Sequence, residues 1–235
     1  MSVVVMVPTW NERENIAPLL DALLALPVAG LTVLIVDDAS PDGTADVVRE
    51  RATAEPRVRL LYRPAQRGRG FAGAEGFRAA VAAGAEAVVE MDADFSHDPA
   101  DIPRLLAALG TADVVLGSRA AAGGGESGRG LGRRILTRVA AGLVRLVLGV
   151  RVGDPTSGFR AFRRDALVAI RPETLASPGP GIVQEVLYRA QRAGLRIVEV
   201  PITFNQRTRG KSKLGPSALL RVLWGLLALR WRGVG

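Results

Sequence analysis

Short runs of apolar residues alternate along the first half of the chain with longer segments whose apolar positions recur every three or four residues. Runs of this length predict buried strands, and the periodic segments predict helices. Strands are predicted at residues 3–7, 31–36, 58–62, 85–91 and 113–117, with helices after the first strand, from 44 and from 71. Strands that alternate with helices in this way pair in parallel through right-handed crossovers. The pattern therefore predicts a doubly wound α/β layer.

The pattern changes after Arg119. Residues 120–132 are rich in glycine and carry no apolar period, which predicts a mobile loop. An amphipathic helix is predicted next, with apolar positions Ile135, Val139, Leu143, Leu146 and Val147 and with Arg133, Arg134, Arg138 and Arg145 on or near its other side. A helix at 182–193, a strand at 196–200 and a basic loop at 205–214 complete this half.

Residues 215–235 form a separate C-terminal segment. Positions 218–231 are strongly apolar and include Trp224 and Trp231, but they fall short of the ~20 residues that a membrane-spanning helix needs. Trp and Arg at the flanks favour a helix in the membrane interface, and a helix docked on the core is an equal alternative. The predicted organisation is one domain at 1–214, with halves 1–119 and 120–214, followed by this helix.

The composition is that of a globular protein with a basic surplus. Apolar residues make up 48% of the 235 residues, and 31 Lys and Arg against 23 Asp and Glu give a net charge of +8. This surplus suits phosphate-bearing ligands or an anionic membrane surface, whereas no aromatic-rich basic stripe indicates nucleic acid. The absence of Cys excludes disulfides, zinc–thiolate sites and a thiol nucleophile. No basic region precedes the first strand, so no secretory signal is expected.

Two carboxylates one residue apart, Asp92 and Asp94, follow the predicted strand at 85–91. Open parallel sheets place ligands at the carboxyl ends of their strands. Carboxylates held this close repel each other, and a hard cation that bridges them to an anionic substrate such as a diphosphate relieves the repulsion. The alternative is that they cap a turn or the helix that opens near Pro99.

The other strands also end in polar residues, which are Asn11-Glu12, Asp37-Asp38 and Gly117-Ser118-Arg119. Parallel strands would bring these ends to one edge of the sheet. Acidic residues there suit a metal or the hydrogen-bond donors of a ribose and a base, but not phosphate itself. The phosphates of a nucleotide diphosphate would then be met by the cation and by Arg119, Arg207 and Lys213.

A competing motif is Gly68-Arg69-Gly70-Phe71-Ala72-Gly73, which matches the dinucleotide-binding pattern G-x-G-x-x-G. That pattern belongs to the turn after the first strand of a dinucleotide fold. Here the first strand ends in Pro8-Thr9-Trp10-Asn11-Glu12, and five residues separate Tyr62 from Gly68. These features argue against a nicotinamide-dependent oxidoreductase.

The motifs together resemble an inverting glycosyltransferase of family 2 with the GT-A fold, and within it the polyprenol-phosphate (dolichol-phosphate) mannosyltransferases. They follow the family's order to about residue 214. The residues that carry the resemblance are Pro8 to Glu12, Val36 to Thr44, Met91 to His97, Gly117 to Arg119, Asp154 to Ala161, Glu199 to Ile202, and Arg207 with Gly210, Ser212 and Lys213.

The resemblance implies a role for each group of residues. Pro8, Asn11, Glu12, Asp37 and Asp38 would bind the nucleotide sugar, most often GDP-mannose. Asp92 and Asp94 would hold Mg²⁺ or Mn²⁺ at its diphosphate, and Asp154, Thr156 and Ser157 belong to the motif that would approach the sugar. The acceptor phosphate of a polyprenyl lipid would meet Arg119, Ser157, Arg207 and Lys213, and Asp94, Arg119 and Arg207 would carry catalysis.

The expected setting is the cytoplasmic face of a membrane, with a peripheral enzyme that a separate membrane protein could anchor. The family often has an acid where this chain has Gln206, and its members often end in transmembrane helices. Two alternatives remain open. One is the same lipid acceptor with another donor such as UDP-glucose, and the other is a membrane-associated nucleotide-sugar-binding protein without turnover.

The chemistry of the acceptor bears on the single histidine of the chain, His97. A phosphate monoester is anionic near neutral pH and needs no strong general base, unlike a sugar hydroxyl. Catalysis would rest on positioning and on stabilising the departing diphosphate. His97 is therefore expected to support a turn rather than to act as a base.

Overall fold

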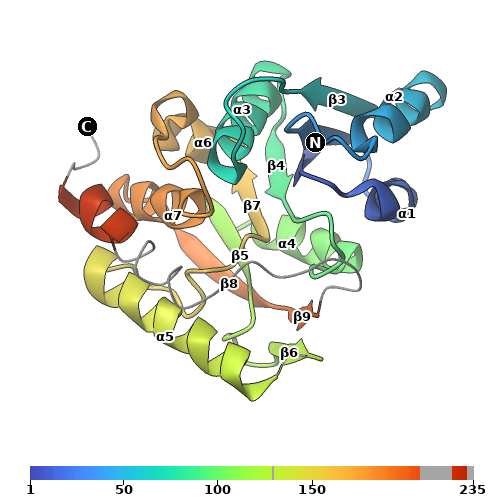
Figure 1. Ribbon diagram of the computed structural model, residues 1–235. Helices are drawn as coiled ribbons and strands as arrows, with labels where there is room; N and C mark the ends of the chain where they lie inside the picture. The colour runs from blue at the N-terminus through green and yellow to red at the C-terminus, as the bar shows by residue number, and fades with distance from the viewer. Residues whose placement is uncertain (129, 207–223, 232–235) are drawn as a thin grey trace.

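The computed structural model describes residues 1–128, 130–206 and 224–231. Seven strands form one sheet in the order β3-β2-β1-β4-β7-β5-β8 (Figure 1). Their bounds are β1 Val3–Thr9, β2 Leu31–Asp37, β3 Val58–Tyr62, β4 Ala87–Glu90, β5 Val114–Ser118, β7 Arg160–Arg163 and β8 Ile197–Pro201. Strands from both predicted halves of the chain thus belong to a single sheet.

The expected doubly wound, mostly parallel sheet is confirmed. β1 pairs in parallel with β2 and with β4, and β5 pairs in parallel with β8. β7, which the apolar pattern did not predict, runs antiparallel between β4 and β5. It escapes prediction because it has four residues and both of its ends are arginines. Its amino end therefore lies at the edge where the other strands end.

Helices cover both faces of the sheet. The helices are α1 Arg13–Leu24, α2 Thr44–Ala54, α3 Arg69–Ala82, α4 Ile102–Ala108, α5 Leu131–Leu148, α6 Arg164–Ile170 and α7 Ile182–Arg192, with short 3₁₀ turns η1 Pro99–Asp101 and η2 Pro172–Thr174. One core joins α1, α2 and α4 to Val3, Val5 and Val7 of β1. The other joins α3, α5, α6 and α7 to Val4 and Met6. This division follows from the alternation of side chains along a strand.

The first helix begins without a side-chain cap. Neither Thr9 nor Asn11 caps α1, which follows Glu12 without a side-chain cap. Thr9 is still in β1, where its hydroxyl donates to Asp37 Oδ2 over 3.0 Å. α2 follows Gly43 and likewise has no side-chain cap, although Asp42 Oδ1 accepts a hydrogen bond of 3.0 Å from the Thr44 amide.

The segment predicted as an irregular loop, 120–132, contains a strand. β6 (Gly125–Ser127) pairs in parallel with β9 (Thr203–Asn205), and both strands were absent from the sequence prediction. Three-residue strands carry too few residues to show an alternation. β6 leads into α5 along the lower edge of the molecule in Figure 1.

The C-terminal residues 224–231 are helical. Leu226 is buried in the core shared by α3, α5, α6 and α7, whereas Trp224 and Trp231 are 72% and 90% exposed. This helix therefore docks on the core through one side and presents its tryptophans to solvent. None of the helices in the described ranges is long and apolar enough to cross a membrane.

Candidate active site

The ends of β1, β2 and β4 bring the predicted polar residues together. Thr9 pairs with Asp37 across β1 and β2, and Met6 pairs with Glu90 across β1 and β4. Asp92 follows two residues after the end of β4. The sheet edge thus gathers the acidic residues predicted from three separate parts of the chain.

Asp37 lies at the centre of the polar residues that follow β1 and β2, and it is fully buried. Its carboxylate accepts hydrogen bonds from the Thr9 hydroxyl, from the Ser40 amide over 2.9 Å and from the Ser40 hydroxyl over 2.6 Å. The Ser40 hydroxyl oxygen in turn accepts from the Asn11 amide over 2.9 Å. Asp37 therefore fixes the loop after β1 against the loop after β2.

Glu12 and Pro8 flank this group. The Glu12 amide donates to the Thr44 hydroxyl over 3.0 Å, and its carboxylate accepts a 2.7 Å hydrogen bond from the Asn15 side chain. Pro8 is a buried member of β1, which continues through Thr9 rather than stopping at the proline. The polar residues after β1 thus form one hydrogen-bonded loop with Ser40 and Thr44.

Asp38 faces a different set of partners. It is buried and forms an ion pair with Arg63, and its Oδ2 accepts a 2.8 Å hydrogen bond from the Gly68 amide. Arg63 also pairs with Glu75 at 2.7 Å. Asp38 therefore holds the loop before α3 in place, and its neighbour Asp37 lies in the group at the strand ends.

Asp92 and Asp94 differ in exposure. The side chain of Asp92 is 34% exposed, whereas Asp94 is buried. Asp94 Oδ1 accepts hydrogen bonds from the Ser96 amide over 3.1 Å and from the Ser96 hydroxyl over 2.6 Å. The sequence also allowed these carboxylates to cap a turn, and Asp94 Oδ1 does so through its two hydrogen bonds from Ser96.

The donor set of Asp92 and Asp94 fits a hard divalent cation. Mg²⁺ is typically bound by one or two carboxylates together with substrate phosphates and water, rather than by a cage of protein ligands alone. Across residues 1–128, 130–206 and 224–231, no group of three His, Cys, Asp or Glu side chains could hold a metal by itself. A cation at this pair would therefore depend on the substrate for the rest of its ligands.

His97 supports the loop that carries these carboxylates. It is buried, its ring stacks on Phe159 with 5.0 Å between centroids, and its Nδ1 accepts a 3.2 Å hydrogen bond from the Asp92 amide. Burial of the imidazole lowers the pKa of His97, and this effect outweighs the negative charges of Asp92 and Asp94, which raise the pKa. A neutral imidazole held in this way orients the backbone at Asp92.

Behind Asp92 lies a charge network that the sequence analysis missed. Glu90 is fully buried; it forms an ion pair with Arg160, and its Oε1 lies 2.8 Å from Arg69 Nη2. The same Nη2 lies 3.5 Å from Asp92 Oδ1. Arg69 therefore connects the buried carboxylate of β4 to the partly exposed carboxylate of the site.

One sequence signal could have revealed this network. Glu90 interrupts the apolar run of a predicted buried strand, and a buried carboxylate needs a cationic partner. Its partners come from residues 21 positions before it and 70 positions after it, so periodicity could not identify them. Arg69 was part of the glycine-rich motif, where only the glycines were considered.

Arg119 lies at the end of β5 against the motif that follows α5. Its Nε and Nη2 donate to the two carboxylate oxygens of Asp154 over 2.6 Å each, and Nη2 also donates to the Thr156 hydroxyl over 2.6 Å. Burial raises the pKa of Asp154, but the hydrogen bonds and charge of Arg119 outweigh it and hold the pKa below its usual value. Glu126 of β6 lies 3.6 Å from Arg119 Nη1.

Ser157 completes the turn between Asp154 and β7. It is buried, and its hydroxyl oxygen accepts a 3.3 Å hydrogen bond from the Phe159 amide. A Cβ atom at the next residue, Gly158, would lie 3.8 Å from Asp92 Oδ2. The motif that begins at Asp154 therefore comes close to the predicted cation ligands. Two further predicted residues, Arg207 and Lys213, lie outside the described residues.

The glycine-rich motif serves packing between chain segments. The Gly70 amide donates to the Pro178 carbonyl over 3.0 Å, and a Cβ atom at Gly70 would stand only 1.7 Å from the Ser177 carbonyl oxygen. The segment before α7 thus occupies the start of α3, where a dinucleotide fold would bind phosphate. This contact argues further against the oxidoreductase interpretation.

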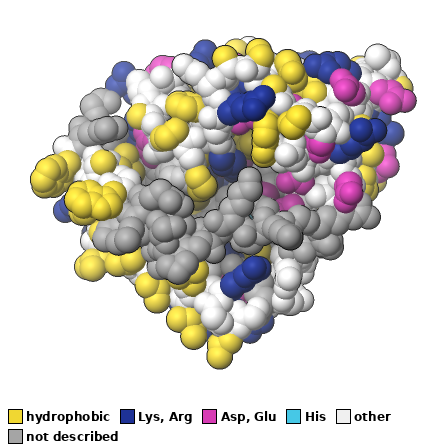
Figure 2. All heavy atoms as spheres, in the orientation of Figure 1, with side chains coloured by type: hydrophobic (Ala, Val, Ile, Leu, Met, Phe, Trp, Pro, Cys, Tyr) yellow, Lys and Arg dark blue, Asp and Glu magenta, His cyan; other side chains and the backbone are white. Residues whose placement is uncertain are grey.

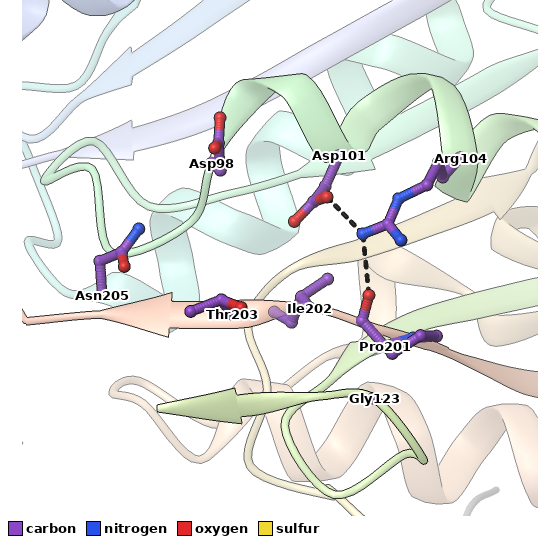
Figure 3. A pocket seen from close by; sticks show the side chains of 8 residues that line it. All are labelled: Asp98, Asp101, Arg104, Gly123, Pro201, Ile202, Thr203 and Asn205. Atoms are coloured by element: carbon purple, nitrogen blue, oxygen red, sulfur yellow. Dashed lines mark hydrogen bonds and ion pairs between the residues drawn. The ribbon is translucent and has the colours of Figure 1, made fainter. Parts of the chain in front are cut away.

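A small polar cavity of about 250 Å³ lies beside the acidic loop, lined by Asp98, Asp101, Arg104, Gly123, Pro201, Ile202, Thr203 and Asn205 (Figure 3). In it Arg104 pairs with Asp101 and donates to the Pro201 carbonyl over 2.9 Å. A more apolar groove of about 650 Å³ runs between α1 and residues 95–100. Neither is lined by Asp92 or Asp94, so neither contains the predicted cation ligands.

The chain is similar to known glycosyltransferases. The model of glycosyl transferase family 2 matches residues 4–171. An undecaprenyl-phosphate mannosyltransferase of Micrococcus luteus is 42% identical across 100% of this chain and 98% of that protein. A polyprenol monophosphomannose synthase of Mycolicibacterium smegmatis is 39% identical across 94% of this chain and 86% of that protein.

Solved structures with the same fold include glucosyl-3-phosphoglycerate synthase from Mycobacterium tuberculosis. Its complex with Mn²⁺, UDP-glucose and phosphoglyceric acid matches with a TM-score of 0.71 and 23% identity, over 98% of this chain and 80% of that one. Its complex with Mn²⁺, UDP and glucosyl-3-phosphoglycerate matches with a TM-score of 0.70 and 24% identity, over 100% and 81%. At this identity the likeness establishes the fold.

Proposed function

Because the chain belongs to glycosyl transferase family 2, we propose that it transfers mannose from GDP-mannose to a polyprenyl monophosphate, with inversion at the anomeric carbon. The fold is of the GT-A class. The observation that carries the proposal is the 42% identity, over the whole of this chain, to an undecaprenyl-phosphate mannosyltransferase. The gathering of acidic residues at the ends of β1, β2 and β4 supports it.

The donor would lie across the strand ends. Asn11, Glu12 and Asp37, with Pro8 beside them, would bind the base and ribose, because a polar loop with acidic oxygens suits hydroxyl and amino donors. Asp38 would support this site through its contact with the Gly68 amide. The diphosphate would then reach Asp92 and Asp94.

Asp92 and Asp94 would hold Mg²⁺ or Mn²⁺, which neutralises charge on the diphosphate when it is bound. The chemistry of the donor set fits this role, and solved structures of the same fold contain Mn²⁺ with a nucleotide sugar. His97 and Arg69 would orient Asp92, one through the backbone amide and the other through the carboxylate. These residues position the ligand and touch no reacting atom.

The acceptor phosphate would approach from the side of Arg119 and Ser157. Because Asp154 accepts hydrogen bonds from the Arg119 guanidinium, Arg119 would act on the phosphate mainly through its charge. The Ser157 hydroxyl oxygen accepts a hydrogen bond from the Phe159 amide, and its proton would be donated to the phosphate. Arg207 and Lys213 would contribute further positive charge. An anionic acceptor attacks without a strong base, in keeping with a histidine that is committed to the loop.

A second candidate keeps the fold and the acceptor but uses UDP-glucose as donor. Solved structures that share the fold contain UDP-glucose, and this observation favours the alternative. A nucleotide-sugar-binding protein without turnover is a remote third candidate, against which the presence of both Asp92 and Asp94 argues.

The test is a transfer assay with purified protein, Mg²⁺ or Mn²⁺, a short-chain polyprenyl phosphate and radiolabelled GDP-mannose beside UDP-glucose. Label that enters the lipid phase only from GDP-mannose supports the proposal. Label that enters the lipid phase only from UDP-glucose supports the second candidate instead. Donor binding without transfer from either would contradict both.

A further inference from the structure

Strand β9 contacts the arginine at the end of β5. Pairing between β6 and β9 places Phe204 opposite Glu126, and Glu126 Oε1 lies 3.6 Å from Arg119 Nη1. The guanidinium carbon of Arg119 lies 5.1 Å from the centroid of the Phe204 ring, within the range of a cation–π contact. The ring and the carboxylate of this two-stranded sheet therefore both border Arg119, the residue that would face the acceptor phosphate.

The same side chain contacts the loop that carries the proposed cation ligands. The Phe204 ring lies edge to face against His97, with 5.5 Å between the ring centroids and 77° between the ring planes. Aromatic rings favour this arrangement because the positive edge of one ring meets the negative face of the other. His97 in turn accepts the hydrogen bond from the Asp92 amide. Phe204 is therefore one contact removed from the backbone of a proposed cation ligand.

A backbone contact of β9 leads to the second carboxylate. The amide of Asn205, the residue after Phe204, donates to the Ser96 carbonyl over 3.0 Å. Ser96 itself donates from its amide and from its hydroxyl to Asp94 Oδ1. Two consecutive residues of β9 thus contact the two residues that hold the proposed cation ligands in place.

The two parts of the site carry opposite charge. The loop after β4 holds Asp92, Asp94 and Asp98, whereas Arg119 follows the end of β5. Figure 2 shows acidic side chains in the region of that loop and a basic side chain below them, nearer β6. β9 lies between α4 and β6 (Figure 1, Figure 3), where the two parts meet. The strand is therefore placed to determine how far apart a cation and an anionic acceptor are held.

We propose that Phe204 is a positioning residue that couples the acceptor side of the site to the cation side. Its ring contacts the Arg119 guanidinium and the His97 imidazole at once, so one side chain sets the relative position of the two sides. The inference rests on the proposed function, in which Arg119 meets the acceptor phosphate and a cation meets the diphosphate. A misplacement of about 1 Å between reacting groups can cost roughly a hundredfold in rate, so this spacing matters for transfer.

Packing in the core does not account for Phe204. Its side chain is only partly buried, and it belongs to neither hydrophobic core of the described part of the chain. Phe77, by contrast, is fully buried and lies edge to face against Phe162, with 5.3 Å between centroids. The two phenylalanines make the same kind of ring contact, Phe77 in the core and Phe204 at the site. Phe77 therefore serves as the reference for the loss of a ring that has no part in the site.

Phe204→Leu removes the aromatic ring and keeps an apolar side chain, whereas Phe204→Tyr keeps the ring. Binding of Mn²⁺ alone is followed by electron paramagnetic resonance, and binding of a short-chain polyprenyl phosphate by calorimetry. Phe204→Leu should weaken binding of Mn²⁺ roughly threefold and of the lipid phosphate roughly fivefold, because both contacts of the ring are lost. Phe204→Tyr should stay within about twofold of wild type for both ligands, since the ring remains.

Phe77→Leu is the matched control. It should lower the melting temperature at least as much as Phe204→Leu, because it leaves a cavity in the core, and it should keep both affinities within about twofold of wild type. A double-mutant cycle locates the coupling. In a His97→Gln background, Phe204→Leu should no longer weaken binding of Mn²⁺ but should still weaken binding of the lipid phosphate.

Thermal melts followed by circular dichroism establish that the variants remain folded. Three results would overturn the inference: unchanged affinities in Phe204→Leu, loss of affinity for the lipid phosphate alone, or equal losses in Phe77→Leu. The second would confine Phe204 to the acceptor side, and the third would show a general effect of lower stability. Neither binding measurement requires turnover. A wild-type protein that binds both ligands as expected yet transfers no sugar would therefore contradict the proposed function and leave this inference standing.

Discussion

Arg119 at the end of β5 and Asp154 in the turn before β7 are joined by two side-chain hydrogen bonds of 2.6 Å each, and Asp154 Oδ2 also accepts from the Arg119 amide over 3.1 Å. The two residues are 35 positions apart, with the whole of α5 between them. Both side chains are nearly buried, at 11% and 4% exposure. This pair therefore joins the two ends of the segment that contains β6 and α5 and holds both ends at the active site.

Asp154→Asn should destabilise the protein by about 3–5 kcal/mol, because removing one partner of a buried ion pair leaves the other charge uncompensated. Chemical denaturation at neutral pH measures this loss. Asp101→Asn removes the corresponding partner from the Arg104 pair, in which the arginine side chain is 53% exposed, and should cost at most about 1 kcal/mol. Equal losses in the two variants would contradict a structural role for the Arg119–Asp154 pair.

The same pair predicts a pH dependence. The pKa of Asp154 is lower in the folded protein than its usual value of 3.8, so the carboxylate stabilises the fold above that value and loses its contribution as the pH falls through the folded-state pKa. The stability difference between wild type and Asp154→Asn should therefore be constant near neutral pH and shrink in strongly acidic solution. A stability difference that grows on acidification would contradict a lowered pKa of Asp154 in the folded protein.

Asp94→Asn should abolish transfer while the fold remains intact. Loss of a cation ligand removes charge stabilisation at the diphosphate, and we expect transfer to fall by at least about a hundredfold. Asp98→Asn is the control, because Asp98 lies on the same loop but caps η1 through the Ala100 amide. Mn²⁺ binding followed by electron paramagnetic resonance gives a readout apart from activity, and wild-type binding and transfer in Asp94→Asn would remove the proposed cation site.

Arg69→Gln should weaken binding of Mn²⁺ by roughly tenfold, because the groups behind a metal ligand orient it. It should also destabilise the fold, since Glu90 loses one of its two cationic partners in a fully buried position. Arg69→Lys should restore part of the metal affinity.

Arg67→Gln is the matched control for Arg69. Arg67 lies two residues earlier and stacks over Trp10, with 4.7 Å from its guanidinium carbon to the ring centroid. It should leave the affinity for Mn²⁺ within about twofold of wild type. Equal effects of the two substitutions would indicate that the overall charge of the loop matters, rather than the contact between Arg69 and Asp92.

Gly70→Ala should destabilise the protein by about 2 kcal/mol or more, because the new methyl group would meet the Ser177 carbonyl oxygen at 1.7 Å and the backbone would have to move. At Gly132 in α5 an added Cβ atom would have no contact within 4 Å among the described residues, so Gly132→Ala should be neutral or stabilising by up to about 1 kcal/mol. Thermal melts of the two variants make the comparison. A harmless Gly70→Ala would show that the segment before α7 does not pack on the start of α3.

Arg207→Ala tests the acceptor site in a stretch outside the described residues. If Arg207 binds the lipid phosphate, the substitution should raise the KM for the polyprenyl phosphate by roughly tenfold or more and change donor affinity little. Arg209→Ala removes the same charge from the same stretch and serves as the control. Equal losses for donor and acceptor, measured by calorimetry and kinetics, would assign Arg207 to the donor or to the fold.

The amino-acid sequence by itself determined the sheet of parallel strands and most of its helices. Continuous apolar runs such as Val3 to Val7 specify buried strands, and this signal is local in the chain. The same reasoning located Asp37 and Asp92 at strand ends, because the end of an apolar run marks the end of the strand. The motif resemblance led to the family, which the comparisons then established.

Tertiary structure alone decided which residues are neighbours and which apolar residues are buried. Arg69, Glu90 and Arg160 form one network across 91 residues of sequence, and no period connects them. In α5 the sequence contains apolar residues on two faces, and only the position of the sheet determines that Val144 is buried while Ile135 and Leu146 are exposed. Periodicity describes one element at a time, whereas burial and ion pairing are properties of the surfaces that several elements form together.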